Sequence, residues 1–374
     1  MGALIQSCQL IVQPKSKSPG EYPDLAMHTH RREFLLTGLE LSSLALWQPG
    51  VGSQDLANWK SARRGQYKGQ TSYVLETKTL AAEFIHQGGR MVSLRHKASN
   101  REFLVQQQSG EYLKAEYAKV MIPAQAAGYD DMFPTILECF YPDFPWKGVL
   151  MPDHGEVWAL DWDVEQERQA LAFSVSGVRL PYRLVRRARF TAENRLRLEY
   201  ALENLAPFEL LYLWSAHPMF QVEAGCQFIL PPECRRAKTS TSLSGRIGRY
   251  GDEFDWPIWT DSKAARHNLS LLRGPEAQDL EKYFFSDRLV HGWCRLAFPS
   301  SRLILSISFS PKEIRYLAIV VGENIPGDPR TYALLEPCTA PFDRLDLSTS
   351  YTTESSLMPK AKRTWSIEFS VDLA

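Results

Sequence analysis

The chain has 374 residues, and its 43 lysines and arginines balance its 43 aspartates and glutamates, so the formal net charge is zero. This balance argues against a nucleic acid or an anionic membrane surface as the main partner. The hydrophobic content of 44% and the charged content of 23% are ordinary globular values and exclude a disordered or collagen-like chain. Because no run of 18 apolar residues occurs, no transmembrane helix is predicted.

The N-terminal segment carries an export-like signal. Residues 29–36, with Arg31 and Arg32 at their centre, resemble the twin-arginine motif, and an apolar stretch from Phe34 to Trp47 follows. We therefore expect residues 1–53 to be a leader that directs export to the periplasm, with Met27 as an alternative start. The competing interpretation is an amphipathic N-terminal helix on a cytoplasmic protein. In both cases residues 54–374 are expected to form the body, as a single domain.

From about residue 70 onward, apolar residues recur at every second position. The clearest segments are 196–202, 303–309 and 365–371. This period predicts strands that bury one face and expose the other. Two turns predict hairpins between such strands, at residues 191–194 and at the glycine pair 88–89.

No long helical periodicity, internal repeat or low-complexity linker follows the leader. We therefore predict an all-β protein, a large antiparallel β-sandwich. The polar segment from residue 234 to about residue 273 shows little alternation, so we expect long loops over one mouth of the sandwich, where function usually lies.

Aromatic residues are abundant, with 10 Trp, 15 Tyr and 18 Phe, and their flat apolar faces suit sugar rings. The cysteines show neither a CxxC motif nor zinc spacing with histidine, so no metal centre is predicted. Most are expected to be buried free thiols, with pairing of Cys226 and Cys234 left open.

Three short polar segments that interrupt apolar sequence are called polar islands here, and the first occurs at residues 152–158. His154 is followed by a glycine, which permits close approach of a ligand, and Trp158 offers a flat apolar surface nearby. A hydrogen-bonded turn histidine is an equally good interpretation of this island alone. Metal binding by Asp153, His154 and Glu156 is disfavoured because no further ligands cluster there.

Two further islands follow apolar strand ends. His217 comes after the run 210–213 and Trp214, at the end of an expected buried strand. Burial lowers the pKa of an imidazole there and a neighbouring carboxylate raises it, which suits proton transfer near neutral pH. Glu336 directly follows the apolar run 332–335. Burial at the end of such a strand raises the pKa of a carboxyl group toward a range useful for a base. Taken singly, a core histidine and a loop carboxylate are the better interpretations.

The order of these islands resembles the aldose 1-epimerase (galactose mutarotase) family. The resemblance rests on the stretch GGRMVSLR at residues 88–95, then the His-Gly, His-Pro and Leu-Glu-Pro islands. It covers roughly residues 75–373, and the ordered set is more specific than any single motif.

This resemblance implies a galactose mutarotase-like β-supersandwich that interconverts the anomers of a free aldose without a cofactor. It implies Glu336 as the general base, His217 as the general acid and His154 as a histidine that holds the sugar. Trp158 and Trp214, beside the two histidines, are expected to contribute to sugar binding.

The sequence also departs from the family pattern. The Asn-Arg segment that grips sugar hydroxyls in many members is replaced by residues 128–135, where Asp130 and Asp131 are expected to accept hydroxyl hydrogen bonds or to serve as turn carboxylates. An additional family aspartate has only Asp255 and Asp261 as candidates. These departures keep a second hypothesis open, a carbohydrate-binding protein of the same fold without turnover.

Overall fold

The computed structural model describes residues 62–261, 264–350 and 356–374, all within one compact unit, Trp59–Ala374. The twin-arginine-like segment lies outside these residues. Helix in the described part is limited to three short 3-10 turns: η4 (Val157–Ala159), η5 (Pro275–Ala277) and η6 (Leu345–Ser350). No helix in this part is long and apolar enough to cross a membrane.

The first large sheet has twelve antiparallel strands, and all but β5 follow one path. In spatial order they are β1 (Arg63–Tyr67), β2 (Gln70–Glu76), β3 (Leu80–Ile85), β4 (Met91–His96), β6 (Tyr129–Met132), β14 (Ser215–Gln221), β24 (Asp328–Cys338), β23 (Tyr316–Ile325), β20 (Asp279–Phe285), β16 (Arg236–Ser242) and β17 (Glu253–Asp255), with β5 (Arg101–Glu102) beside β4.

The second large sheet has eight antiparallel strands. Their order is β15 (Gln227–Ile229), β21 (Trp293–Phe298), β22 (Leu303–Phe309), β26 (Lys362–Leu373), β12 (Arg195–Asn204), β11 (Tyr182–Ala192), β10 (Ala170–Ser176) and β9 (Asp163–Gln166). Three small pairs complete the fold: β7 (Cys139–Phe140) with β8 (Leu150–Met151), β13 (Leu210–Leu211) with β25 (Ser356–Leu357), and β18 (Ile258–Thr260) with β19 (Arg266–Asn268).

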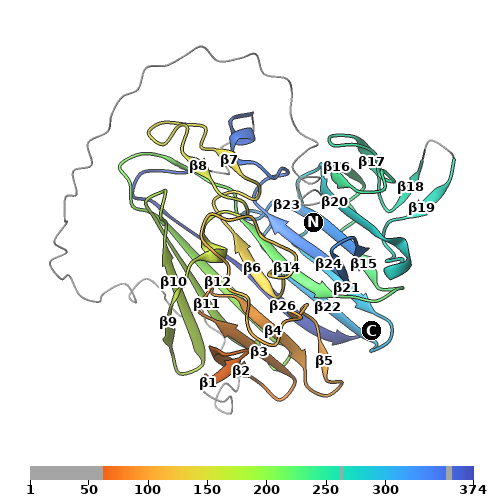
Figure 1. Ribbon diagram of the computed structural model, residues 1–374, viewed down its shortest axis with the longest axis horizontal. Helices are drawn as coiled ribbons and strands as arrows, with labels where there is room; N and C mark the ends of the chain where they lie inside the picture. Colours follow the sequence, from red (N-terminus) through yellow and green to blue (C-terminus); the bar gives the residue numbers. More distant parts are fainter. Residues whose placement is uncertain (1–61, 262–263, 351–355) are drawn as a thin grey trace. The chain divides into compact units, whose positions relative to one another are not determined.

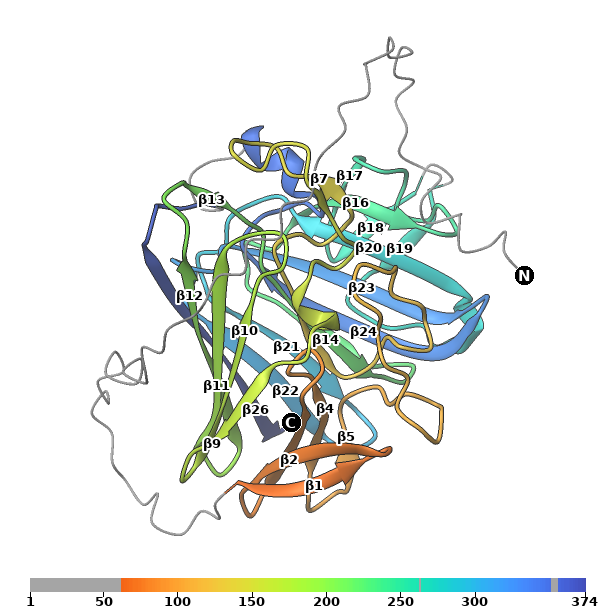
Figure 2. The same ribbon diagram turned by 60° about the vertical axis from the view of Figure 1, so that its left-hand side comes forward.

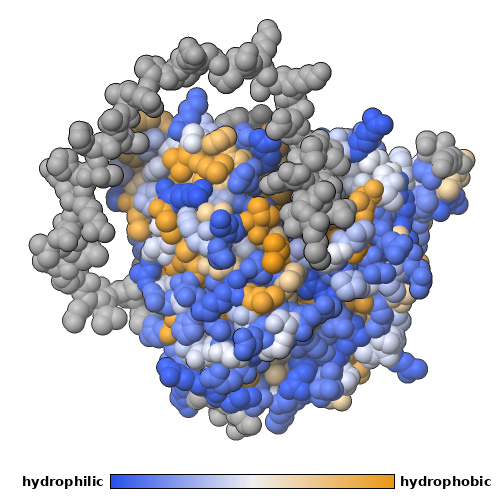
Figure 3. All heavy atoms as spheres, in the orientation of Figure 1, coloured by the Kyte–Doolittle hydropathy of each residue, from blue (hydrophilic) through white to orange (hydrophobic). Residues whose placement is uncertain are grey.

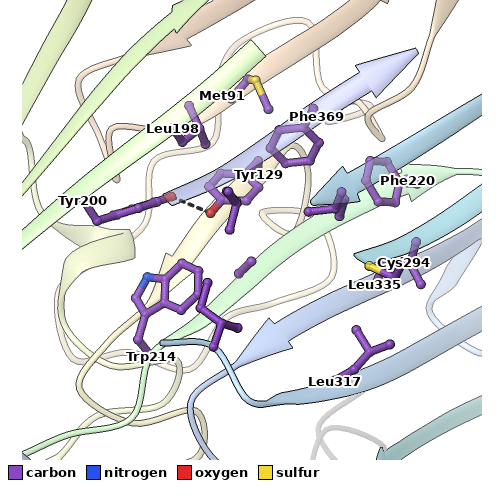
Figure 4. Close-up of a cluster of buried hydrophobic side chains, with 14 of the residues drawn as sticks. Met91, Tyr129, Leu198, Tyr200, Trp214, Phe220, Cys294, Leu317, Leu335 and Phe369 are labelled. Carbon is purple, nitrogen blue, oxygen red and sulfur yellow. Dashed lines mark hydrogen bonds between the residues drawn. The ribbon is translucent and has the colours of Figure 1, made fainter. Parts of the chain in front are cut away.

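The two large sheets pack face to face and enclose the main hydrophobic core (Figures 1 and 2). Tyr129 of β6 meets Phe369 of β26 edge to face at a centroid distance of 5.8 Å. The Tyr129 hydroxyl also lies 2.6 Å from the hydroxyl of Tyr200 on β12 (Figure 4). The predicted all-β sandwich is therefore confirmed, because side chains from both sheets interdigitate in one core.

Both predicted hairpins are present. Strands β11 and β12 pair from Tyr182–Asn204 to Ala192–Arg195, and β3 and β4 pair around the turn that holds Gly88 and Gly89. Both glycines have positive φ, 68° and 53°, a backbone region that other residues rarely adopt.

The expectation of long loops between residues 234 and 273 is wrong in part, because β16 to β19 lie in this segment. Strand β16 continues the twelve-stranded sheet, and only Ala237 and Thr239 on it are buried. An outer strand with polar side chains on both faces lacks the period-two apolar pattern that marks an inner strand.

The cysteines from Cys139 to Cys338 are all buried and unpaired in the described part of the chain. Cys226 and Cys234 therefore form no disulfide.

Candidate active site

Three neighbouring strands of the twelve-stranded sheet bring the predicted polar residues into one row. Asp130 on β6 lies opposite His217 on β14. On the other side of β14, Ser215 pairs with Cys338 and Met219 with Leu334, a register that sets His217 beside Glu336 on β24. Because residues opposite each other in a sheet share a face, the three side chains point the same way, away from the core between the sheets.

Glu336 is the centre of this row. Its Oε1 is 3.8 Å from Nε2 of His217, and its Oε2 is 3.4 Å from Nζ of Lys282 on β20. Neither oxygen has an aligned hydrogen-bond partner, although the side chain is fully buried. A buried carboxylate whose two oxygens both lack an aligned hydrogen bond is unusual.

His154 joins the row from a different segment, the turn that follows β8. Its ring centroid is 5.3 Å from that of His217, at an interplanar angle of 74°. The side chains of His154, His217 and Lys282 are 21%, 12% and 16% exposed, so each presents one edge to solvent. The two predicted histidines and the predicted glutamate are therefore brought together.

The pKa values of the central pair are displaced toward each other. Burial raises the pKa of Glu336, although the Lys282 ammonium opposes this rise. Burial also lowers the pKa of His217 well below its usual value, and the positive charges of His154 and Lys282 add to this effect. Burial therefore disfavours the charged form of each group, the carboxylate of Glu336 and the imidazolium of His217.

Asp130 lies beside His217, but its carboxylate is already engaged. Its Oδ1 accepts a hydrogen bond from Nε of Arg90 at 2.6 Å, and both side chains are almost fully buried. Burial nevertheless raises the pKa of Asp130. Nη2 of Arg90 is buried without a partner, so this pair keeps one unused donor.

Asp131 and Trp214, which the sequence analysis placed with the sugar-binding residues, lie elsewhere. Asp131 accepts hydrogen bonds from Nη1 of Arg186 at 2.7 Å and from Nε1 of Trp214 at 3.0 Å. Figure 4 shows Trp214 within the cluster of core side chains, and its ring contacts Tyr200 and Trp365. Successive residues of a strand alternate faces, so Asp130 joins the row and Asp131 faces the core.

Trp158 lies close behind His154 rather than beside a free surface. Its centroid is 6.2 Å from that of His154, its Nε1 donates to the Asp153 carbonyl oxygen at 3.1 Å, and it is only 1% exposed. Glu156 is occupied by the hydroxyls of Tyr117 and Tyr182. Trp158 and Glu156 therefore support the turn that carries His154.

The sequence analysis missed Lys282 and Asp343. The two side chains form an ion pair of 2.7 Å, and Ser240 donates a hydrogen bond to Oδ2 of Asp343 at 2.6 Å. The candidates Asp255 and Asp261 lie apart: Asp255 is exposed on β17 and Asp261 pairs with His267. Lys282 shares β20 with Asp279 and Glu281, a charged run typical of an exposed strand, so no sequence signal marked Lys282 as a site residue, and none marked Asp343.

Comparisons with known proteins support the fold. No protein-family model and no curated protein sequence matches this chain. Among solved structures, a galactose mutarotase-like protein from Lactobacillus casei is 17% identical, with a TM-score of 0.53 over 80% of this chain and 99% of its own. A candidate aldose 1-epimerase from Escherichia coli K12 is 16% identical, with a TM-score of 0.58 over 82% of this chain and 100% of its own.

A galactose mutarotase related enzyme from Lactobacillus acidophilus is 14% identical, with a TM-score of 0.56 over 80% of this chain and 97% of its own. The chain therefore has the galactose mutarotase-like fold, and the predicted resemblance is confirmed at the level of fold. Because function depends on the site rather than the fold, these low identities do not establish a reaction.

Proposed function

We propose that the protein is an aldose 1-epimerase-like enzyme that interconverts the anomers of a free sugar. The observation that carries this proposal is the row on one face of the sheet, with Glu336 between His217 and Lys282 and with His154 against His217. Ring opening needs one group that takes the proton of the anomeric hydroxyl and another that gives a proton to the ring oxygen. No redox or cofactor step enters this reaction.

In this proposal Glu336 is the base, His217 is the acid, and His154 holds the sugar. After rotation about the C1–C2 bond of the open chain, the two groups exchange roles and the ring closes as the other anomer. The two groups can share one bound sugar, because Oε1 of Glu336 lies 3.8 Å from Nε2 of His217. Glu336 is covered in the free protein, so His217 or Lys282 must shift slightly when a sugar binds.

The finer parts of the proposal rest on the sequence. The twin-arginine-like segment supports action on sugars outside the cytoplasm, with a cytoplasmic location as the alternative. The rival function is a carbohydrate-binding protein that holds a sugar at this site without turnover, because Asp131 does not replace the missing hydroxyl-binding segment.

Polarimetry of freshly dissolved α-D-glucose and α-D-galactose tests the proposal. The full chain is expected to accelerate mutarotation, and Glu336→Gln is expected to lose about 10²- to 10⁴-fold of that acceleration, the usual contribution of one acid or base group. The matched control is Glu165→Gln on the exposed strand β9, which should keep the wild-type rate.

Equal rates for Glu336→Gln and the wild type would exclude Glu336 as the base. Sugar binding by calorimetry without any acceleration would favour the carbohydrate-binding protein. Neither binding nor acceleration with a panel of aldoses would reject both functions.

A further inference from the structure

We propose that Asp153 is a positioning residue that fixes His154 as a doubly protonated hydrogen-bond donor toward the sugar. This inference rests on the proposed function and adds a residue to it. Nδ1 of His154 lies 2.8 Å from Oδ2 of Asp153, within the range of a charge-assisted hydrogen bond. A histidine that donates from Nδ1 to a carboxylate leaves Nε2 free for a ligand.

Asp153 is itself held in place from a distant segment. The same oxygen, Oδ2, accepts a hydrogen bond from the backbone N–H of Met121 at 3.2 Å. Met121 belongs to the segment between β5 and β6, which the side chains of Gln107 and Gln125 tie together through bonds to backbone atoms. The carboxylate is therefore oriented before any ligand arrives.

The backbone of His154 is equally constrained. Its φ is 58°, in the left-handed region that few residues other than glycine adopt. Its N–H donates to the carbonyl oxygen of Ile136 at 2.6 Å. The next residue, Gly155, packs so closely on Phe133 that an added Cβ would lie 2.0 Å from the carbonyl oxygen. Strain at a single non-glycine residue is typical of positions where function requires a particular geometry.

The charged groups around His154 agree with this assignment. Burial lowers the pKa of His154, the charge and the hydrogen bond of the adjacent Asp153 carboxylate raise it, and the overall pKa is raised. From the packed strands, Lys282 on β20 opposes the protonated form and Glu336 on β24 favours it. His217 on β14 contacts the ring, and Asp130 on β6 also faces it.

The assignment gives the two histidines different tasks. His154 keeps both protons throughout and donates a charged hydrogen bond from Nε2 to a sugar oxygen, so it neither gains nor loses a proton in the cycle. His217 is the histidine that transfers a proton: it gives one to the ring oxygen as the C1–O bond breaks, while Glu336 takes one from the anomeric hydroxyl. The positive charge of His154 also lowers the pKa of His217, so His217 gives up its proton more readily.

The pH profile of mutarotation by Asp153→Asn tests this role. Loss of the carboxylate lowers the pKa of His154, so a larger share of the variant carries a neutral His154 as the pH rises, and its rate relative to the wild type falls. We expect kcat/KM at pH 7.5 to fall about 10- to 100-fold, the usual cost of a charged hydrogen bond, and the deficit to narrow at lower pH. Asp261→Asn is the matched control, since Asp261 pairs with His267 at 2.9 Å away from the site, and its profile should match the wild type.

Nitrogen-15 NMR of histidine-labelled full chain reads the protonation state without turnover, with the His154 signal assigned by its loss in His154→Asn. The expected result for the wild type is a doubly protonated ring at pH 7 and, in Asp153→Asn, a lower pKa. A neutral His154 ring at pH 7, or a His154 pKa unmoved by Asp153→Asn, would overturn the inference. Absence of turnover with a protonated His154 would instead reject the proposed function alone.

Discussion

Lys282 shows how one charged side chain sets the chemistry of its neighbours. Its ammonium lies 3.4 Å from Glu336 and 2.7 Å from Asp343, and these carboxylates raise its pKa despite burial, which acts in the opposite direction. The lysine is therefore a fixed positive charge at neutral pH. It is the main influence that opposes the effect of burial on Glu336.

We predict that Lys282→Met moves the acidic limb of the mutarotation rate to higher pH. The ammonium lowers the pKa of Glu336, so its removal raises that pKa further, and the base becomes protonated at a higher pH. The pH dependence of kcat/KM for any aldose that the protein turns over measures this shift. Lys238→Met on β16 is the control, because Lys238 is exposed and pairs only loosely with Glu253 at 3.9 Å. An acidic limb that stays in place would show that Lys282 does not act on the base.

At the scale of elements, the turn after β8 positions His154 by a close contact between two backbones. Gly155 has a φ of 73°, forms a parallel bridge with Phe133 and leaves no room for a Cβ. We predict that Gly155→Ala lowers mutarotation more than tenfold and destabilises the fold, because the turn must move away from Phe133. Gly148→Ala is the matched control, since Gly148 has a φ of 86° but open space around its Cβ.

Both glycine variants share the cost of an alanine at positive φ, about 1 kcal/mol, so their difference isolates the contact with Phe133. Thermal denaturation and polarimetry measure the two effects separately. Equal behaviour of the two variants would show that the contact does not hold the turn in place.

An exposed apolar patch lies on the β7–β8 hairpin, just before this turn in the chain. Phe140 and Phe144 of the β7–β8 hairpin are 61% and 68% exposed, and apolar side chains gather around the position of this hairpin in Figure 3. Phe144 also packs edge to face on Phe208 at 5.3 Å. Since His154 comes three residues after this hairpin, the patch lies close along the chain to the proposed site.

For the molecule as a whole, a buried ion pair links the two sheets. Arg186 on β11 donates hydrogen bonds to Asp131 on β6 and to the carbonyl oxygen of Gly89. Its guanidinium lies 5.2 Å from the ring centroid of Trp162. Both charged side chains are fully buried. The pair therefore connects the core to the strand that carries Asp130.

We predict that Arg186→Met lowers the free energy of unfolding by about 3–5 kcal/mol, because it leaves the Asp131 charge buried without a partner. Arg197→Met is the control: Arg197 is 38% exposed and pairs with Glu368 on the surface, so its loss should cost less than about 1 kcal/mol. Urea denaturation followed by tryptophan fluorescence measures both. A change of similar size in the two variants would show that the buried pair contributes no more than a surface pair.

The sequence by itself determined the all-β class and the two hairpins, because alternation of apolar residues and turn residues are local patterns. The resemblance to the aldose 1-epimerase family, rather than any single polar island, proposed His154, His217 and Glu336. It could not decide which of Asp130 and Asp131 faces the site, since a shift of one residue in register reverses the faces of a strand. Lys282, Asp343 and the Met121 contact to Asp153 come from distant segments. Strand pairing brings Lys282 to Glu336, and loop segments bring Asp343 and Met121 into place, so the tertiary structure alone decided the groups that surround the proposed catalytic residues.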